Sequence, residues 1–173
     1  MAQTKNVSPI GTKAGLRLDR TGPYAAKTLR TDMTKPEPYR LTRDAYPVGQ
    51  EITTRVSDID GNGHLNAIRI GKFYEEARAS FYKLLDHGKR HPRVLVAELK
   101  IRYLGEGFWP GTVEVRTGIV RLGSSAFTMG QGLWQNGVCI GLCETVLVHA
   151  PQGKTTPLPD EFRGQLERYL LTR

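Results

Sequence analysis

An apolar stripe in the middle of the chain, followed by strand-like segments, constrains the fold more than any other feature. Between residues 66 and 86, apolar side chains recur every three or four positions, which is the spacing of one buried face of an α-helix. The stripe consists of Ile70, Phe73, Tyr74, Ala77, Phe81, Leu84 and Leu85. Asn66 can cap the start of this helix, and Gly88 followed by Pro92 can end it.

Strand-like segments surround the predicted helix. They cover residues 48–57 before it and residues 93–104, 111–122, 124–135 and 137–150 after it. The last four are separated only by EGFWPG, GSS and QNG, and such short links predict that successive strands are antiparallel neighbours. A short closing helix is expected over residues 159–172. Because the stripe must be buried on the sheet, the fold class is α+β, with a five-stranded antiparallel sheet around a long central helix.

The composition is typical of one soluble globular domain. The chain has 173 residues, 39% of them hydrophobic, which is enough to bury a core. It contains no continuous apolar stretch of about 18 residues, and its N-terminus lacks the apolar segment of a signal peptide. We therefore expect no membrane span and a cytoplasmic location.

The formal net charge of +8 is concentrated near the N-terminus. Residues 1–45 contain nine Lys and Arg against four Asp and Glu, and they show no helical or strand periodicity. This pattern predicts a basic, poorly ordered extension over residues 1–45 and a folded domain over residues 46–173. Because the charge lies mainly in the extension, the pattern does not favour nucleic-acid binding.

Two cysteines, Cys139 and Cys143, lie in one predicted strand. At about 3.3 Å per residue their Cα atoms are roughly 13 Å apart, which is beyond the reach of a disulfide. No partner ligands at metal spacing lie nearby. Both thiols are therefore expected to be reduced residues of the core or of a sheet face.

The segment DIDGNGHLN, residues 58–66, partly matches a calcium-binding loop. Asp58, Asp60, Asn62 and Gly63 occupy its first, third, fifth and sixth positions. The twelfth position requires a bidentate Glu but is Arg69, whose positive charge repels a cation. The preceding residues EITTRV alternate like a strand rather than a helix. We therefore expect no metal ion at this segment.

The same region resembles a known enzyme family. RVSDIDGNGHLNAIRIGKFYEEAR, residues 55–78, resembles the signature of hot-dog thioesterases of the 4-hydroxybenzoyl-CoA thioesterase type. It is also similar to the catalytic turn of plant acyl-carrier-protein thioesterases, and the order of elements agrees over residues 46–170. In two departures, Ala67 replaces a second Asn and Ile70 replaces a Tyr. The resemblance implies a hot-dog fold, and the departures concern the mouth of the acyl pocket.

Thioester hydrolysis needs a group that attacks the carbonyl carbon or activates water, and donors for the developing oxyanion. At the start of the helix, residues 62–66 are expected to offer free backbone N–H groups and the positive end of the helix dipole. Glycines at 61 and 63 would let a substrate carbonyl approach the backbone closely. Gly63, Leu65 and Asn66 are therefore candidate substrate-binding residues.

The resemblance implies that Asp60 is the nucleophile or general base. Alternatively, Asp58 and Asp60 only brace the turn by accepting backbone hydrogen bonds. His64 is a candidate for orienting water or substrate, or it is structural. Asn62 either positions the reacting groups or serves the turn.

Two glutamates are alternative catalytic carboxylates. Glu75 occupies the family's helical E-x-A-R position, although such a residue can equally be solvated or paired with Arg78 or Arg69. Glu106 resembles a second carboxylate of the plant enzymes, or belongs to an ordinary polar turn.

Ser124 and Ser125, with Arg121 nearby, are candidates for binding the phosphates of coenzyme A. The resemblance then implies an acyl-CoA or acyl-carrier-protein thioester hydrolase that releases acid and thiol without a metal or cofactor. Hot-dog domains pair their sheet edges, so a homodimer or homotetramer with the site at the interface is expected. The alternatives are a hot-dog acyl-thioester dehydratase or hydratase, and a non-catalytic acyl-CoA-binding regulator.

Overall fold

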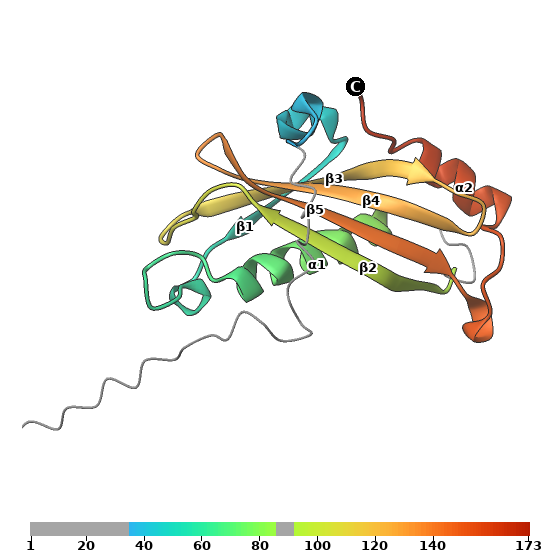
Figure 1. Ribbon diagram of the computed structural model, residues 1–173, viewed down its shortest axis with the longest axis horizontal. Coiled ribbons are helices and arrows are strands. Elements are labelled where there is room, and N and C mark those ends of the chain that lie inside the picture. The colour runs from blue at the N-terminus through green and yellow to red at the C-terminus, as the bar shows by residue number, and fades with distance from the viewer. Residues whose placement is uncertain (1–34, 86–91) are drawn as a thin grey trace, which may run out of the picture. The chain divides into compact units, whose positions relative to one another are not determined.

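Five antiparallel strands form one sheet, and a long helix packs along one of its faces (Figure 1). The computed structural model describes residues 35–85 and 92–173. The strands are β1 (Val48–Thr53), β2 (Val94–Tyr103), β3 (Thr112–Leu122), β4 (Ala126–Gln135) and β5 (Val138–His149), and the helices are α1 (Ala67–Leu84) and α2 (Asp160–Glu167). The order across the sheet is β1-β3-β4-β5-β2. The fold is the expected α+β hot-dog fold, with α1 as its central helix.

Helix α1 confirms most of the predicted stripe. The side chain of Asn66 caps it by accepting a hydrogen bond from the Ile68 N–H at 2.8 Å. The stripe residues from Ile70 to Phe81 are buried, as is Leu85. Leu84 is 53% exposed, contrary to the prediction, because the helix ends there and the extended backbone of Leu85 turns the next side chain into the core. Residues 86–91, including Gly88, lie outside the described residues.

Helix α1 and the sheet enclose two apolar clusters. One lies near the start of α1 and includes Leu65, Tyr74 and Leu133, and the other lies near its end and includes Phe81 and Met129. The prediction of a strand over residues 48–57 is too long, because a 3-10 turn (Val56–Asp58) follows β1. This turn leads the chain directly into the DIDGNG segment.

Strands β3, β4 and β5 are antiparallel neighbours as predicted, but β2 and β3 are not. β2 pairs with β5 and forms an edge of the sheet, so β4 and β5 lie between β2 and β3. Residues 104–111, named the crossover loop here, carry the chain past these two strands. The Leu104 and Gly105 N–H groups both donate to the Ile140 carbonyl, at 3.0 and 3.2 Å. The loop is thus held at the end of the sheet that also carries the DIDGNG segment.

The expected extension over residues 1–45 is partly described, and this part is ordered. Residues 36–47, named the strap here, include 3-10 helices at Pro38–Leu41 and Arg43–Ala45 and lie on the face of the sheet opposite α1 (Figure 1). Arg40 is 5% exposed and donates to the Tyr46 hydroxyl at 3.0 Å and to Glu144 of β5 at 2.7 Å. The compact unit therefore begins at Pro36 rather than at residue 46. Residues 1–34 lie outside the described residues.

The closing helix is shorter than the predicted range 159–172. After α2 the chain extends beside β3, where the Ile119 N–H donates to the Tyr169 carbonyl at 2.7 Å and the Leu171 N–H donates to the Ile119 carbonyl at 2.9 Å. A side chain at Gly118 would collide with Leu171, so this glycine lets the tail approach β3. Among the residues described, no helix is long and apolar enough to cross a membrane.

Candidate active site

The turn over residues 58–66, named the Asp60 turn here, is organised around the carboxylate of Asp60. Asp60 Oδ1 accepts hydrogen bonds from the Asn62 N–H at 2.8 Å and from the His64 N–H at 3.3 Å. The Asp60 backbone also pairs with His64, its N–H donating to the His64 carbonyl at 2.9 Å. Gly63 has φ +84°, which favours glycine. One oxygen of Asp60 thus braces the turn, while the described residues provide no hydrogen-bond partner for Oδ2.

Asp58 has a different environment. Its side chain is buried, Oδ2 accepts from the Arg55 N–H at 2.8 Å, and Oδ1 lies 3.8 Å from Arg69 Nε. Both oxygens therefore face groups of the protein, as expected for a residue that only braces the turn. Within residues 35–85 and 92–173, no group of three His, Cys, Asp or Glu side chains could hold a metal ion.

The backbone N–H groups of residues 62–66 are not free, contrary to expectation. The first three donate to Asp60, that of Leu65 donates to the Gly107 carbonyl at 2.7 Å, and that of Asn66 donates to the Asp58 carbonyl at 2.8 Å. The turn is closed by the Asp60 carboxylate, by the backbone carbonyls of Asp58 and Asp60, and by the crossover loop. The N–H groups of Gly61 and Ala67 make no hydrogen bond within the described part of the chain, and Ala67 is the first residue of α1.

The crossover loop brings two side chains to His64. An isolated antiparallel bridge joins His64 to Phe108, and their rings meet edge to face with centroids 5.4 Å apart. Glu106 Oε1 lies 3.6 Å from His64 Nδ1. The structure therefore gathers Asp60, Asn62, His64 and Glu106 at one end of the sheet, beside the first turn of α1.

Glu75 lies elsewhere. Its side chain is 58% exposed and its carboxylate pairs with Lys72 Nζ at 3.1 Å, rather than with Arg69 or Arg78. Glu75 stands eight residues beyond Ala67, about 12 Å along the helix axis at about 1.5 Å per residue. Its local surroundings are those of a solvated surface pair.

Ser124 and Ser125 lie in the turn between β3 and β4. From there β4 runs for 10 residues to the crossover loop, about 30 Å at about 3.3 Å per residue. A single chain therefore does not bring these serines to Asp60. Their predicted contact with the phosphates of coenzyme A stays a prediction.

The family of the chain follows from its match to known proteins. A family model for the thioesterase-like superfamily matches residues 54–166, more than half of the chain, including the Asp60 turn and the central helix. The chain belongs to the thioesterase-like superfamily. The expectation of a thioesterase is confirmed at this level, and the 4-hydroxybenzoyl-CoA type stays a prediction. A search of curated protein sequences found no match.

Solved structures of thioesterases share this fold. A predicted thioesterase from Bacillus stearothermophilus is 28% identical, with a TM-score of 0.66 over 72% of this chain and 97% of its own. A thioesterase from Thermus thermophilus, complexed with coenzyme A and Zn, is 26% identical, with a TM-score of 0.65 over 72% and 95%. YbaW, a probable thioesterase from Escherichia coli, is 19% identical and shows the fold alone, with a TM-score of 0.63 over 70% and 98%.

The two cysteines of this superfamily member are free, as predicted. Burial raises the pKa of the Cys143 thiol to about 11 and also raises the pKa of Cys139. Both thiols are therefore protonated near neutral pH and are weak nucleophiles. They offer no alternative to the carboxylates of the Asp60 turn.

Two residues near the site were missed in the sequence. Gln135, at the end of β4, bonds both backbone groups of Phe108, and the Tyr103 hydroxyl of β2 donates to the Ala67 carbonyl at 3.3 Å. No local pattern marks them, because each acts on a segment at least 27 residues away in the chain. Only the pairing of β2 with β5, and of β4 with both of its neighbours, brings them to the site.

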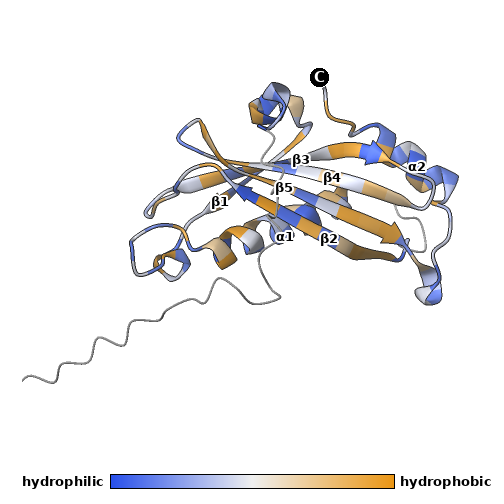
Figure 2. Cartoon of the chain, in the orientation of Figure 1, coloured by the Kyte–Doolittle hydropathy of each residue, from blue (hydrophilic) through white to orange (hydrophobic). Residues whose placement is uncertain are grey.

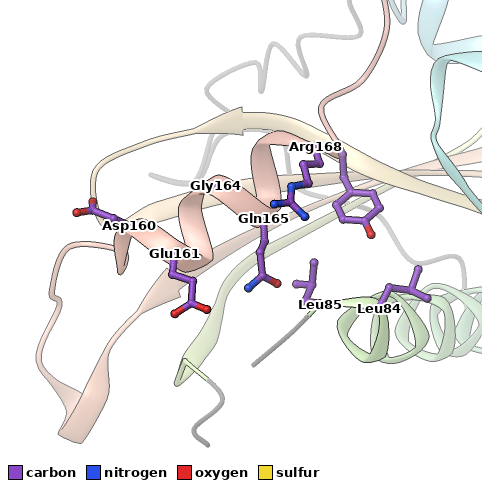
Figure 3. Close-up of a pocket in the computed structure, with 8 residues that line it drawn as sticks. Leu84, Leu85, Asp160, Glu161, Gly164, Gln165 and Arg168 are labelled. Carbon is purple, nitrogen blue, oxygen red and sulfur yellow. The ribbon is translucent and has the colours of Figure 1, made fainter. Parts of the chain in front are cut away.

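A cavity of about 420 Å³ lies at the far end of α1 (Figure 3). It is lined by Leu84, Leu85, Asp160, Glu161, Gly164, Gln165, Arg168 and Tyr169. The 18 residues of α1 span about 27 Å, so the length of the helix separates this cavity from the Asp60 turn. It is not part of the candidate active site.

Proposed function

We propose that this thioesterase hydrolyses acyl-CoA or acyl-carrier-protein thioesters with Asp60 as its catalytic carboxylate. The proposal rests on the different contacts of the two carboxylate oxygens of Asp60. Oδ1 accepts the hydrogen bonds that brace the turn, whereas Oδ2 has no hydrogen-bond partner among the described residues. Oδ2 can attack the thioester carbon directly or take a proton from the attacking water. Direct attack breaks the C–S bond and leaves a mixed anhydride on Asp60, which a water molecule then hydrolyses to release the acid and regenerate the carboxylate. In the other route the activated water adds to the carbonyl carbon, and the C–S bond breaks as the acid forms. In both routes the thiolate that leaves takes up a proton, so that one water molecule is consumed for each thioester.

The oxyanion is stabilised at the start of α1. Because residues 62–66 use their N–H groups inside the turn, the proposed donors are the N–H groups of Gly61 and Ala67. The positive end of the helix dipole adds to their effect on the negative oxygen. Neither donor needs to break an existing hydrogen bond when the substrate arrives.

His64, Asn62 and Glu106 support this chemistry. The backbone of His64 makes two hydrogen bonds to Asp60, and its ring faces Glu106. We assign it to orienting water or the leaving thiol, with Glu106 fixing the ring. Asn62 donates its N–H to Asp60 Oδ1 and so orients the carboxylate.

The thiol carrier is proposed to be coenzyme A. The Thermus thermophilus thioesterase, 26% identical to this chain, binds coenzyme A. Gly63, Leu65 and Asn66 border the reacting carbonyl in this proposal, whereas Ser124 and Ser125 would contact the phosphates.

A panel of acyl-CoA and aroyl-CoA thioesters with free-thiol detection tests the proposal. Asp60→Asn keeps an oxygen that can accept from Asn62 and His64 but removes the charge, so kcat should fall about 10²–10⁴-fold with little change in Tm. Asp58→Asn is the matched control, and it should lower Tm while costing far less activity. If the wild-type protein binds acyl-CoA but releases no thiol from any thioester of the panel, the protein is a non-catalytic acyl-CoA-binding protein and the proposal is wrong.

A substitution of Glu75 tests whether the catalytic carboxylate lies on α1 instead of in the Asp60 turn. Glu75→Gln should leave kcat within about twofold, because Glu75 is solvated and paired with Lys72. If Asp60→Asn instead stays active while Glu75→Gln is inactive, the catalytic carboxylate lies on α1.

One observation favours a second candidate, an acyl-thioester hydratase or dehydratase. That reaction needs a histidine and an acid that transfer a proton to or from a carbon atom of the acyl group. His64 and Glu106 could serve as this pair, since Glu106 Oε1 lies 3.6 Å from His64 Nδ1. Incubation with an enoyl-CoA separates the two reactions. Loss of the conjugated double bond without thiol release would support hydration.

A further inference from the structure

We infer that Gln135 is a positioning residue that holds the crossover loop against His64. Gln135 is 6% exposed, its Oε1 accepts from the Phe108 N–H at 2.8 Å, and its Nε2 donates to the Phe108 carbonyl at 2.8 Å. One carboxamide thus makes both bonds that a neighbouring strand would make to a single residue. The catalytic consequence of this contact rests on the proposed function.

The segment that Gln135 holds supplies the contacts of the His64 ring. Phe108 meets the ring edge to face at 5.4 Å, and Glu106 Oε1 lies 3.6 Å from Nδ1. Between them, the Gly107 carbonyl accepts from the Leu65 N–H at 2.7 Å. The Glu106 side chain is 63% exposed, so its own packing does not fix it. Its place beside His64 depends on the backbone of the loop.

Apart from the Gly107 bond to Leu65, the other backbone anchors of the loop lie near its ends. Leu104 and Gly105 bond to Ile140 at one end, and the Gly111 carbonyl accepts from the Thr54 N–H and hydroxyl at the other. Phe108 lies between these anchors, and its side chain is 48% exposed. An apolar residue at 135 would leave the Phe108 N–H and carbonyl without their hydrogen-bond partners, which is unfavourable for groups shielded from water. Both groups can hydrogen-bond to water if the loop moves outward, and this movement would take Phe108 away from His64.

Gln135→Met removes both hydrogen bonds at nearly constant volume. Gln131→Met is a matched control, because Gln131 is also a buried glutamine of β4 with hydrogen bonds to backbone and side-chain atoms, those of Tyr74 and Thr117. Gln131 is fully buried beneath α1, and neither of its hydrogen bonds involves His64 or the crossover loop. The two variants therefore separate a general loss of buried hydrogen bonds from a specific loss at the loop.

NMR reports the position of the loop without any substrate. In the wild-type protein, nuclear Overhauser contacts should join the His64 and Phe108 rings, and the ring current of Phe108 should shift the His64 C–H signals. Gln135→Met should lose the contacts and move these signals toward ordinary values, whereas Gln131→Met should keep both. Retained His64–Phe108 contacts in folded Gln135→Met would overturn the inference.

Kinetics test whether the positioning serves hydrolysis. Gln135→Met should lower kcat about tenfold and change KM by less than about twofold. The substitution misplaces the reacting groups but leaves substrate binding intact. In a His64→Gln background the same change should alter kcat by less than about twofold, since residues acting as one unit are not additive. Equal losses in both backgrounds would show that Gln135 does not act through His64. If the wild-type protein releases no thiol, the proposed function fails, while the NMR result still decides the position of the loop.

Discussion

At the residue scale, two buried tyrosines differ in what their hydroxyls contact. Tyr74 of α1 is 0% exposed, and its hydroxyl has no hydrogen-bond partner in the described part of the protein. Tyr46 of the strap is 1% exposed, but its hydroxyl accepts from Arg40 Nε at 3.0 Å and donates to the Arg40 carbonyl at 2.9 Å. Burial raises the pKa of both hydroxyls, so both stay neutral at physiological pH.

Removing the two hydroxyls should have opposite effects on stability. Tyr74→Phe deletes an unpaired buried polar atom and should raise the free energy of unfolding by about 1 kcal/mol. Tyr46→Phe leaves Arg40 Nε and the Arg40 carbonyl without the hydroxyl as a partner and should lower the free energy of unfolding by about 1–3 kcal/mol. Urea unfolding of both variants measures the difference. A loss of stability in Tyr74→Phe equal to that in Tyr46→Phe would contradict the assignment of an unpaired hydroxyl.

At the element scale, the strap is an integral layer of the domain. The guanidinium of Arg40 lies on the outer face of β4 at Gly130, where a side chain would approach Arg40 Nη2 to 3.0 Å. Arg43 pairs with Glu114 of β3, and Arg116 Nη1 donates to the Arg43 carbonyl at 2.9 Å. The strap therefore covers the outer face with charged groups that are paired to the sheet.

Truncation on either side of the strap should have different consequences. A chain beginning at residue 36 keeps these contacts and should unfold at nearly the same urea concentration as the full chain. A chain beginning at residue 46 loses Arg40 and both 3-10 helices and should lose about 2 kcal/mol or more of stability. Equal midpoints for the two truncated proteins would show that the strap contributes nothing.

At the scale of the whole molecule, β2 is an edge strand, paired only with β5 among the described residues. The strand contains hydrophobic residues (Figure 2), and those that are exposed include Leu95 at 48%, Val96 at 51% and Leu99 at 50%. On the neighbouring surface Tyr103 is 50% exposed and Ile68 of α1 is 77% exposed. An apolar edge strand with free backbone groups invites pairing with another chain.

We expect two copies of the chain to associate through β2, so light scattering should give about twice the 19.3 kDa chain mass. Leu99→Lys should shift the protein toward monomer, because it places a charge in the contact. Val138→Lys is the control, since Val138 is equally apolar and 61% exposed but lies at the β4–β5 turn. A monomer at micromolar concentration, or equal effects of both substitutions, would refute this interface.

The sequence alone determined those features that depend on local periodicity and turn chemistry. The stripe from Ile70 to Phe81 and the Asn66 cap predicted α1, and the GSS and QNG turns predicted the β3–β4 and β4–β5 hairpins. The DIDGNGHLN segment was assigned to the candidate active site through its resemblance to hot-dog thioesterases, whereas turn chemistry predicted only that its residues hydrogen-bond within a few positions of each other, as they do.

Only the tertiary structure decided what depends on contacts between distant segments. β2 joins β5 rather than β3, through a ladder that runs from Val94 to Tyr103 with one register shift, and no turn sequence reveals this pairing. The strap is ordered by Glu144 and Glu114, which lie 104 and 71 residues further along the chain than the arginines they pair with. The Asp60 turn is closed by Gly107, and Gln135 holds Phe108 beside His64 across 27 residues. Such contacts have no period in the sequence, because their partners are set by the order of strands in the sheet.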